Sequence, residues 1–259
     1  MHIEIVSVLA TQPNTGAAAA ALTGDSLTVK NANRTKKVQI ISAWGTRQVA
    51  GFMQLIFPSG HDTTRGFRCG LPVGAGSLSL PLGEQIEVQP QETLAVTIAG
   101  SNVAGDIEQD SFLVMYEDMP GIDARLITYS ELNRKGDKRT TIESSIASVA
   151  TGQYSEELIN SDSDLLLANR DYAVVGMQTR TAAHALTLRG PDLGNVRVGC
   201  PGNLRPELTS QWFALMSKVT GIAAIPVINS GNKGSTFIGF SADENAATTL
   251  VTLQLVLLK

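Results

Sequence analysis

The chain has 259 residues, a net charge of −4 and 17% charged side chains, against roughly 25% in an average soluble protein. This length allows one large domain or two modest ones, and the weakly acidic balance argues against strong direct binding of nucleic acid. The low charge indicates either surface that is buried between subunits or a surface of small, neutral residues.

Localisation follows from two further features. No apolar run approaches the length of a transmembrane helix, and the opening MHIEIVSVLATQ lacks the basic start of a signal peptide. We therefore expect the protein to stay in the cytoplasm where it is made, or in a particle assembled there.

In chain order, residues 1–29 indicate an N-terminal arm. MHIEIVSV is typical of a strand that adds to a sheet, and the alanine-rich Gly16–Gly24 indicates a flexible segment or a short helix. Residues 30–120 then contain short β-branched or alternating runs separated by turn residues, which predict strands. These runs are VQIISAW, GFMQLIF, FRCGL, LSLPL, QIEVQ, TLAVTIAG and SFLVMYE.

Residues 121–164 have a different composition. ARLITYSELNR and TIESSIASVATGQYSEELIN show helical spacing and more charge, so we expect a linker of helix and loop that caps or bridges the parts on either side.

Residues 165–259 again predict strands, interrupted by one helix. The helix is Thr209–Gly221, with Thr or Ser as its N-cap and Gly221 at its end. Near the C-terminus, Val251, Leu253 and Leu255 alternate with more polar residues and are expected to face a core. Asn229–Ser235 is predicted to be a turn between two strands. The strands are YAVVGMQT, HALTLRG, NVRVG, AAIPVINS, STFIGF and TLVTLQLVLL.

The two strand-rich halves repeat one another. Thr46–Pro58 and Thr179–Pro191 have the same length, both begin with Thr-Arg and both end on Pro, at an offset of 133 (179 − 46). Extra residues are expected in the second half around Ser241–Thr248. Other blocks match in the same order: Ala32–Arg34 with Ala168–Arg170, Val38–Ile41 with Tyr172–Val175, Arg65–Pro72 with Gly194–Pro201, Ala95–Asn102 with Ile225–Asn232, and Phe112–Glu117 with part of Leu250–Leu258.

Candidate structural positions come from one of these repeated blocks. Glycine there permits a special backbone angle and proline fixes an edge or turn. The arginines are candidates for pairing across contacts between the repeats, with a salt bridge inside one repeat or a solvated side chain as the alternative. The candidates are Arg68, Gly70 and Pro72, matched by Arg197, Gly199 and Pro201.

No catalytic, metal or cofactor site is expected. His61 and His184 have no second histidine nearby in the sequence, which argues against a cupin-type metal enzyme. Cys69 and Cys200 lack histidine partners for a structural zinc site, so we expect buried free thiols. Ser161–Asp164 together with Asp171 lacks the glycine and terminal glutamate of a calcium loop, which favours a cap or turn.

Two β-rich repeats with an inserted helix suggest two jelly rolls in tandem, and the chain resembles the double-jelly-roll major capsid proteins of tailless icosahedral viruses and phages. The resemblance covers residues 30–259 and rests on architecture and duplication. It implies an all-β chain with a first jelly roll at 30–120, a helix-containing linker at 121–164 and a second jelly roll at 165–259. It also implies an inward-facing N-terminal arm.

The resemblance further implies a structural protein and no enzyme. Three copies would form a pseudo-hexagonal, homotrimeric capsomer of an icosahedral virion shell. Neighbouring capsomers are the expected partners, with minor or penton capsid proteins and an internal membrane as further candidates.

The alternative is a two-domain β-sandwich that binds carbohydrate or a receptor, such as a phage spike. That function needs an exposed aromatic platform, whereas aromatic residues make up only 5% of the chain. Trp44 and Trp212 fall in an apolar strand and in the helix, so both are expected in the core.

Overall fold

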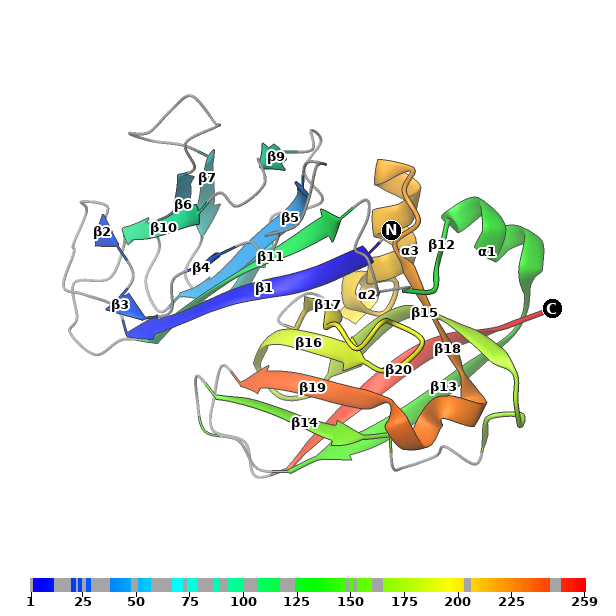
Figure 1. Ribbon diagram of the computed structural model, residues 1–259. Coiled ribbons are helices and arrows are strands. Elements are labelled where there is room, and N and C mark those ends of the chain that lie inside the picture. Colours follow the sequence, from blue (N-terminus) through cyan, green and yellow to red (C-terminus); the bar gives the residue numbers. More distant parts are fainter. Residues whose placement is uncertain are drawn as a thin grey trace. The chain divides into compact units, whose positions relative to one another are not determined.

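The computed structural model describes strands β1–β11 and residues 124–259, apart from 148–149, 151–152, 160–164, 203–205 and 243–247. The chain forms two compact units, residues 5–118 and residues 119–259 together with residues 1–4. Both units consist mainly of antiparallel sheet, which confirms the predicted all-β class (Figure 1). Among the described helices, none combines the length and the apolar character that a membrane crossing requires.

The first unit contains two sheets. One has the order β3-β1-β11-β5-β8, with β9 also paired to β5, and the other has the order β2-β10-β6-β7, with β4 also paired to β10. The strands of the first sheet are β1 (His2–Thr11), β3 (Thr23–Gly24), β5 (Val38–Arg47), β8 (Gly74–Leu78), β9 (Ile86–Val88) and β11 (Ile107–Tyr116). Those of the second are β2 (Ala20–Ala21), β4 (Leu27–Thr28), β6 (Gly51–Ile56), β7 (Phe67–Leu71) and β10 (Thr93–Ala99).

The second unit also contains two sheets, in the orders β12-β18-β15-β20-β13 and β14-β19-β16-β17. The first comprises β12 (Leu126–Ile127), β13 (Gly136–Ile146), β15 (Asp171–Thr179), β18 (Ile225–Asn229) and β20 (Thr249–Leu258). The second comprises β14 (Tyr154–Leu158), β16 (Ala183–Arg189), β17 (Val198–Pro201) and β19 (Phe237–Ala242). The helices are α1 (Tyr129–Lys135), α2 (Pro206–Thr209), α3 (Trp212–Thr220) and the 3₁₀ segment η3 (Ser230–Ser235).

The two units share one strand order. β8 and β9 pair with the same edge of β5, because β11 occupies the other, and β2 and β4 follow one another along β10. Counting each of these pairs as one interrupted strand, β1-β11-β5-β8/β9 corresponds to β13-β20-β15-β18. Likewise β2/β4-β10-β6-β7 corresponds to β14-β19-β16-β17. Eight strands therefore have counterparts that agree in both chain order and sheet position.

The segments expected as an arm and a linker belong to the sheets. Residues 1–29 contain β1–β4, and β1 confirms the strand predicted from MHIEIVSV. Residues 121–164 were expected to be helix and loop, which is correct only for α1. The rest of that expectation is wrong, since β13 and β14 are full members of the two sheets, and β13 pairs with β20 over most of its length.

The sequence repeat maps onto the counterpart strands in part. Phe112–Glu117 and Leu250–Leu258 fall on β11 and β20, as predicted. The match of Ala95–Asn102 with Ile225–Asn232 is wrong, because these segments fall on β10 and β18, which are not counterparts. The extra residues expected around Ser241–Thr248 are wrongly placed, because the large insertion of the second unit is the segment between β17 and β18 that carries α2 and α3. Ala32–Arg34 lies outside the described residues.

The core of the second unit lies between its two sheets. Val251, Leu253 and Leu255 of β20 are at most 1% exposed, which confirms the predicted alternation. A contact between the sheets joins Cys200 on β17 to Met177 on β15, where the thiol donates to the carbonyl oxygen at 3.9 Å.

Helix α3 covers the outer face of the five-stranded sheet, where it contacts β15 and β18. It buries Trp212, and Trp44 of the first unit is buried as well, so both tryptophans occupy core positions as predicted. Gly221 ends the helix with a φ of 75°, a left-handed conformation that glycine adopts readily. Its N-cap is Gln211 and not the expected Thr or Ser, because Thr209 ends the preceding helix α2.

Candidate functional site

The outer face of the sheet β14-β19-β16-β17 carries a connected set of side-chain hydrogen bonds, ion pairs and cation–π contacts. Register places Glu156 on β14 and Thr187 on β16 opposite the same residue of β19, Gly239. Side chains at this row and its neighbours form what we call the Glu156 cluster. Its members are Tyr154, Glu156, Thr187, Arg189, Arg197 and Phe237.

Gly239 makes the centre of the Glu156 cluster possible. The Tyr154 side chain extends over this glycine, so that its hydroxyl meets the Thr187 hydroxyl at 2.8 Å and Glu156 Oε2 at 2.9 Å. A Cβ atom at position 239 would collide with the hydroxyl groups of both Tyr154 and Thr187. The missing side chain therefore provides the space in which the tyrosine lies against the sheet.

Two arginines close the Glu156 cluster. Arg189 forms a two-point hydrogen bond with the Glu156 carboxylate, and its guanidinium carbon lies 4.4 Å from the centre of the Phe237 ring. Arg197 stacks on the Tyr154 ring at 4.3 Å and approaches Glu156 Oε2 at 3.9 Å. Each arginine thus combines an ion pair with a cation–π contact.

The electrostatics of the Glu156 cluster favour a fixed ion pair. Burial alone would raise the pKa of Glu156, but hydrogen bonds from Arg189 and Tyr154 outweigh it and hold that pKa below the ordinary value. Burial raises the pKa of Tyr154. The carboxylate therefore stays ionised and the phenol stays neutral near pH 7, which suits a rigid polar surface.

The sequence-predicted positions lie partly in this cluster. Arg197 interacts inside its own unit, as in the alternative stated for it, while Gly199 and Pro201 follow on β17 opposite Thr187 and Ala185. In the first unit, Arg68 and Gly70 lie on β7 opposite Gln54 and Phe52. Pro72 lies outside the described residues.

Strand register suggests a different match between the repeated blocks. Cys69 lies opposite Met53, and Cys200 lies opposite Leu186. Met53 and Leu186 are both the eighth residue of the blocks that begin at Thr46 and Thr179. The two cysteines therefore occupy counterpart positions, which moves the match of Arg68 with Arg197 by two residues. Cys200 is a buried free thiol, as predicted.

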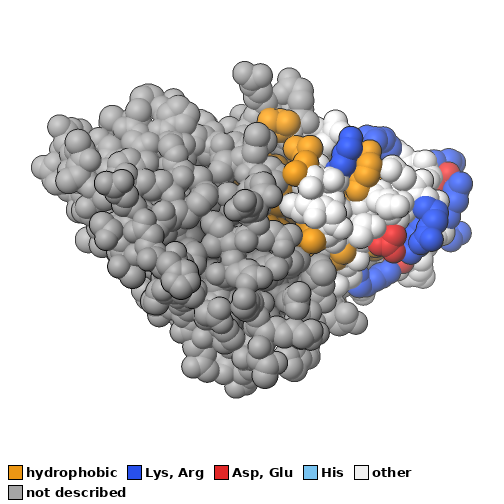
Figure 2. All heavy atoms as spheres, turned by 90° about the horizontal axis from the view of Figure 1, so that it is seen from above, with side chains coloured by type: hydrophobic (Ala, Val, Ile, Leu, Met, Phe, Trp, Pro, Cys, Tyr) orange, Lys and Arg blue, Asp and Glu red, His pale blue; other side chains and the backbone are white. Residues whose placement is uncertain are grey.

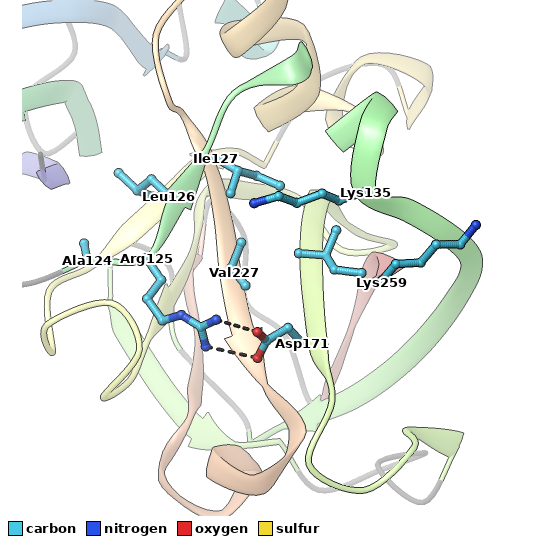
Figure 3. Close-up of a pocket in the computed structure, with 9 residues that line it drawn as sticks. Ala124, Arg125, Leu126, Ile127, Lys135, Asp171, Val227 and Lys259 are labelled. Atoms are coloured by element: carbon cyan, nitrogen blue, oxygen red, sulfur yellow. Dashed lines mark hydrogen bonds and ion pairs between the residues drawn. The ribbon is translucent and has the colours of Figure 1, made fainter. Parts of the chain in front are cut away.

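A second polar network lies where β12, β15 and the turn after β16 meet, and we call it the Arg125 cluster (Figure 3). Arg125 forms a two-point hydrogen bond with Asp171 and lies 3.4 Å from Asp192 Oδ1. The buried Asp192 accepts hydrogen bonds from the Asn229 backbone at 2.9 Å and the Asn232 amide at 3.0 Å. Asn229 also donates its side-chain amide to Asp171 at 2.7 Å.

The Arg125 cluster holds the short edge strand β12 in place. The Arg125 backbone donates to the Asp192 carbonyl oxygen and accepts from the Val227 amide, both at 2.8 Å. Because Asp171 is paired with Arg125, its pKa lies below the usual value. Asp171 therefore has a structural role here, whereas Ser161–Asp164 lies outside the described residues. Arg125 and Asp192 could not be found from the sequence, because their partners are distant along the chain.

A pocket of about 350 Å³ adjoins this cluster (Figure 3). Its two lysines have carboxylate partners, at 3.6 Å between Lys135 and Glu131 and at 3.7 Å between Lys259 and Asp137. The charged side chains that line this pocket are therefore already held in ion pairs within the protein. Its lining is Ala124, Arg125, Leu126, Ile127, Lys135, Asp171, Val227, Leu258 and Lys259.

The described residues contain no cluster of three or more His, Cys, Asp and Glu side chains that could hold a metal ion. His184 is buried on β16, and this burial lowers its pKa to about 3, so the ring is neutral near pH 7. His61 lies outside the described residues.

Comparisons with known proteins leave the family of this chain open. No protein-family model matches it, and no curated protein does. Among solved structures, the PBSX exported protein XepA matches with 11% sequence identity, over 97% of this chain and 86% of that one, at a TM-score of 0.29. A similarity of this size supports no conclusion about fold or function.

Proposed function

We propose that the two units are jelly rolls and that the chain is a structural capsid protein. The observation that carries this proposal is the strand order common to both units. The orders β13-β20-β15-β18 and β14-β19-β16-β17 are those of the two four-stranded sheets of a jelly roll, in which chain positions 1-8-3-6 and 2-7-4-5 are neighbours. The corresponding strands of the first unit support a second roll.

Duplication favours an assembly over a solitary protein. A shell tile with six similar edges can be built from three copies of a chain that contains two similar units, since closed symmetric assemblies reuse the same surfaces. The low share of charged residues, 17%, fits a chain that buries much of its surface against other copies. The proposed assembly is therefore a homotrimeric, pseudo-hexagonal capsomer of an icosahedral virion shell.

The Glu156 cluster on the second unit suits a structural role in a capsid shell. The Glu156 cluster ties three strands together through side chains as well as through the backbone ladder, which stiffens an exposed sheet face. The cluster has no group poised for proton transfer or nucleophilic attack, because its carboxylate is held by arginines. A structural role is thus the simplest use of this face.

Native mass spectrometry of the purified chain tests the proposal. The expected species is a trimer of about 82 kDa (3 × 27.4 kDa), which persists on dilution. Negative-stain electron microscopy of the same sample should show particles with six-fold-like outlines. A chain that stays monomeric at all concentrations contradicts the proposal, and a monomer that also binds cleanly on a glycan array supports the two-domain binding module instead.

A further inference from the structure

Basic side chains gather where helix α1 runs into strand β13. The segment Arg134–Arg139, with the sequence RKGDKR, contains four cations, and the backbone amide of Lys259 donates to the Lys135 carbonyl oxygen at 2.9 Å. Lysine and arginine side chains accordingly dominate the right-hand end of the surface in Figure 2. We call the set Arg134, Lys135, Lys138, Arg139 and Lys259 the basic ridge.

Three cations of the basic ridge lack anionic partners. Glu131 pairs with Lys135, and Asp137 pairs with Lys259. Arg134, Lys138 and Arg139 are exposed and form no ion pair within the described part of the chain. Five cations and two acids leave a local side-chain charge of +3 (5 − 2), although the whole chain carries −4. This local excess attracts anions even though the total charge does not.

The backbone projects this charge outward. β13 is the last strand of its sheet, and its pairing with β20 shifts between Gly136 and Arg139, which is the position of a bulge. Bulges re-aim side chains at sheet edges, and here the irregular residues include Lys138. Lysine on an edge strand also discourages edge-to-edge association.

A pocket of about 230 Å³ opens beside the basic ridge. Its lining includes Tyr129, Asn133, Gln211, Arg139 and Asp137, together with the buried Val175 and Val256. Lys218 Nζ lies 5.6 Å from the centre of the Tyr129 ring and adds a further cation beside it. Both amide side chains are exposed and make no hydrogen bond among the described residues. Pockets that enclose drug-sized ligands measure about 300–1,000 Å³, so this one suits a single planar ring system.

We propose that this corner binds single-stranded nucleic acid, with phosphates on the basic ridge and one base in the adjoining pocket. Unpaired lysine and arginine bind phosphates, aromatic rings stack on bases, and free amides recognise base edges. An anionic lipid surface fits less well, because no exposed large apolar side chain of the described residues belongs to the ridge. Binding is weak because the whole chain carries a net charge of −4. It is sensitive to salt because each phosphate contact releases condensed counterions.

This inference goes beyond the proposed structural function and does not depend on it. The first experiment measures fluorescence anisotropy of labelled oligothymidylate and oligouridylate with the full chain over a range of salt concentrations. The variant Lys138→Gln/Arg139→Gln should weaken binding of both oligonucleotides. It should also reduce the slope of log affinity against log salt by about 1.4, at ~0.7 for each lost phosphate contact.

The matched control removes the same charge elsewhere. Arg170→Gln/Arg180→Gln lowers the net charge by two at exposed positions outside the ridge and should leave the salt slope near that of the unmodified chain. Equal slopes for the ridge variant and the control variant would overturn the proposal, because the attraction would then depend on total charge only.

A second experiment tests the base pocket. Tyr129→Ala should weaken binding of the oligonucleotides about tenfold, while an abasic oligomer of the same length should bind the variant and the unmodified chain equally. Thermal melting checks that the variant is folded, and comparing abasic with normal oligomers on the unmodified chain gives the same information without a substitution. Equal affinity for both oligomers, absence of binding at low salt, or tighter binding to anionic vesicles would each refute the site.

Discussion

The Tyr154 hydroxyl lies 2.8 Å from the Thr187 hydroxyl, although the strands that carry these residues, β14 and β16, are not neighbours in the sheet. Strand β19 lies between them, and Tyr154 crosses it over Gly239. A single side chain thus links β14 to β16 across β19 on the outer face. The same tyrosine is the platform for Arg197, so the position of the arginine depends on the glycine as well.

Replacing Gly239 with alanine should destabilise the second unit by about 1–3 kcal/mol, because an added Cβ would displace the Tyr154 side chain. Urea unfolding followed by circular dichroism measures the change. Gly234→Ala is the matched control, since no atom lies near its added Cβ, and it should change stability by less than about 0.5 kcal/mol. In a Tyr154→Ala background the cost of Gly239→Ala should shrink, and purely additive effects would contradict the account.

Gly176 lies against backbone atoms, whereas Gly239 lies against side chains, so substitution of Gly176 should destabilise the protein more. It lies at the irregularity between β15 and β20, and a Cβ there would collide with the backbone of Thr209 and Ser210. Backbone cannot rotate away as a side chain can, so Gly176→Ala should cost about 3 kcal/mol or more and loosen the packing of α2 on β15. Hydrogen exchange of α2 and α3 should rise in this variant, and protection equal to that of the unmodified chain would refute the explanation.

The strands predicted from local patterns largely agree with the structure, because alternation and turn residues are encoded within a few positions. TLVTLQLVLL corresponds to β20 in full. Strand β13 was missed because its core-facing positions alternate Ile142, Ser144 and Ile146, so a buried serine breaks the apolar pattern. The partner that makes this segment a strand, β20, lies more than a hundred residues away.

The predicted match between Ala95–Asn102 and Ile225–Asn232 was wrong because it relied on local composition alone. Ala95–Asn102 and Ile225–Asn232 are both apolar runs that end in small polar residues, and local composition cannot show which sheet a run joins. Only the hydrogen-bond ladder separates β10 from β18. The polar clusters could not be predicted from the sequence either, because their members are brought together by strand order. Glu156 lies close to Arg189 only because β19 pairs with both β14 and β16.

The pairing of Asp171 with Arg125 predicts a pH dependence of stability. The folded pKa of Asp171 is below its unfolded value near 3.8, so its contribution is complete above about pH 5 and is lost as pH falls through the folded pKa. Asp171→Asn should therefore reduce the loss of stability between pH 7 and pH 3, measured by urea unfolding. The effect should be at most about 1 kcal/mol, because both partners are partly exposed to solvent. An identical loss in the variant would contradict this role.

Cys200 should be inert toward thiol reagents in the folded protein. Its side chain is fully buried, and this burial raises the pKa of the thiol. Alkylation requires a thiolate that the reagent can reach. In the folded unit the thiol stays protonated and is buried, so neither condition is met. Brief treatment with iodoacetamide followed by peptide mass spectrometry should find Cys200 unmodified in buffer and fully modified in urea. Because labelling then reports opening of the β16–β17 region, Gly176→Ala should increase its rate in buffer, and rapid labelling of the unmodified chain would show that the thiol is accessible.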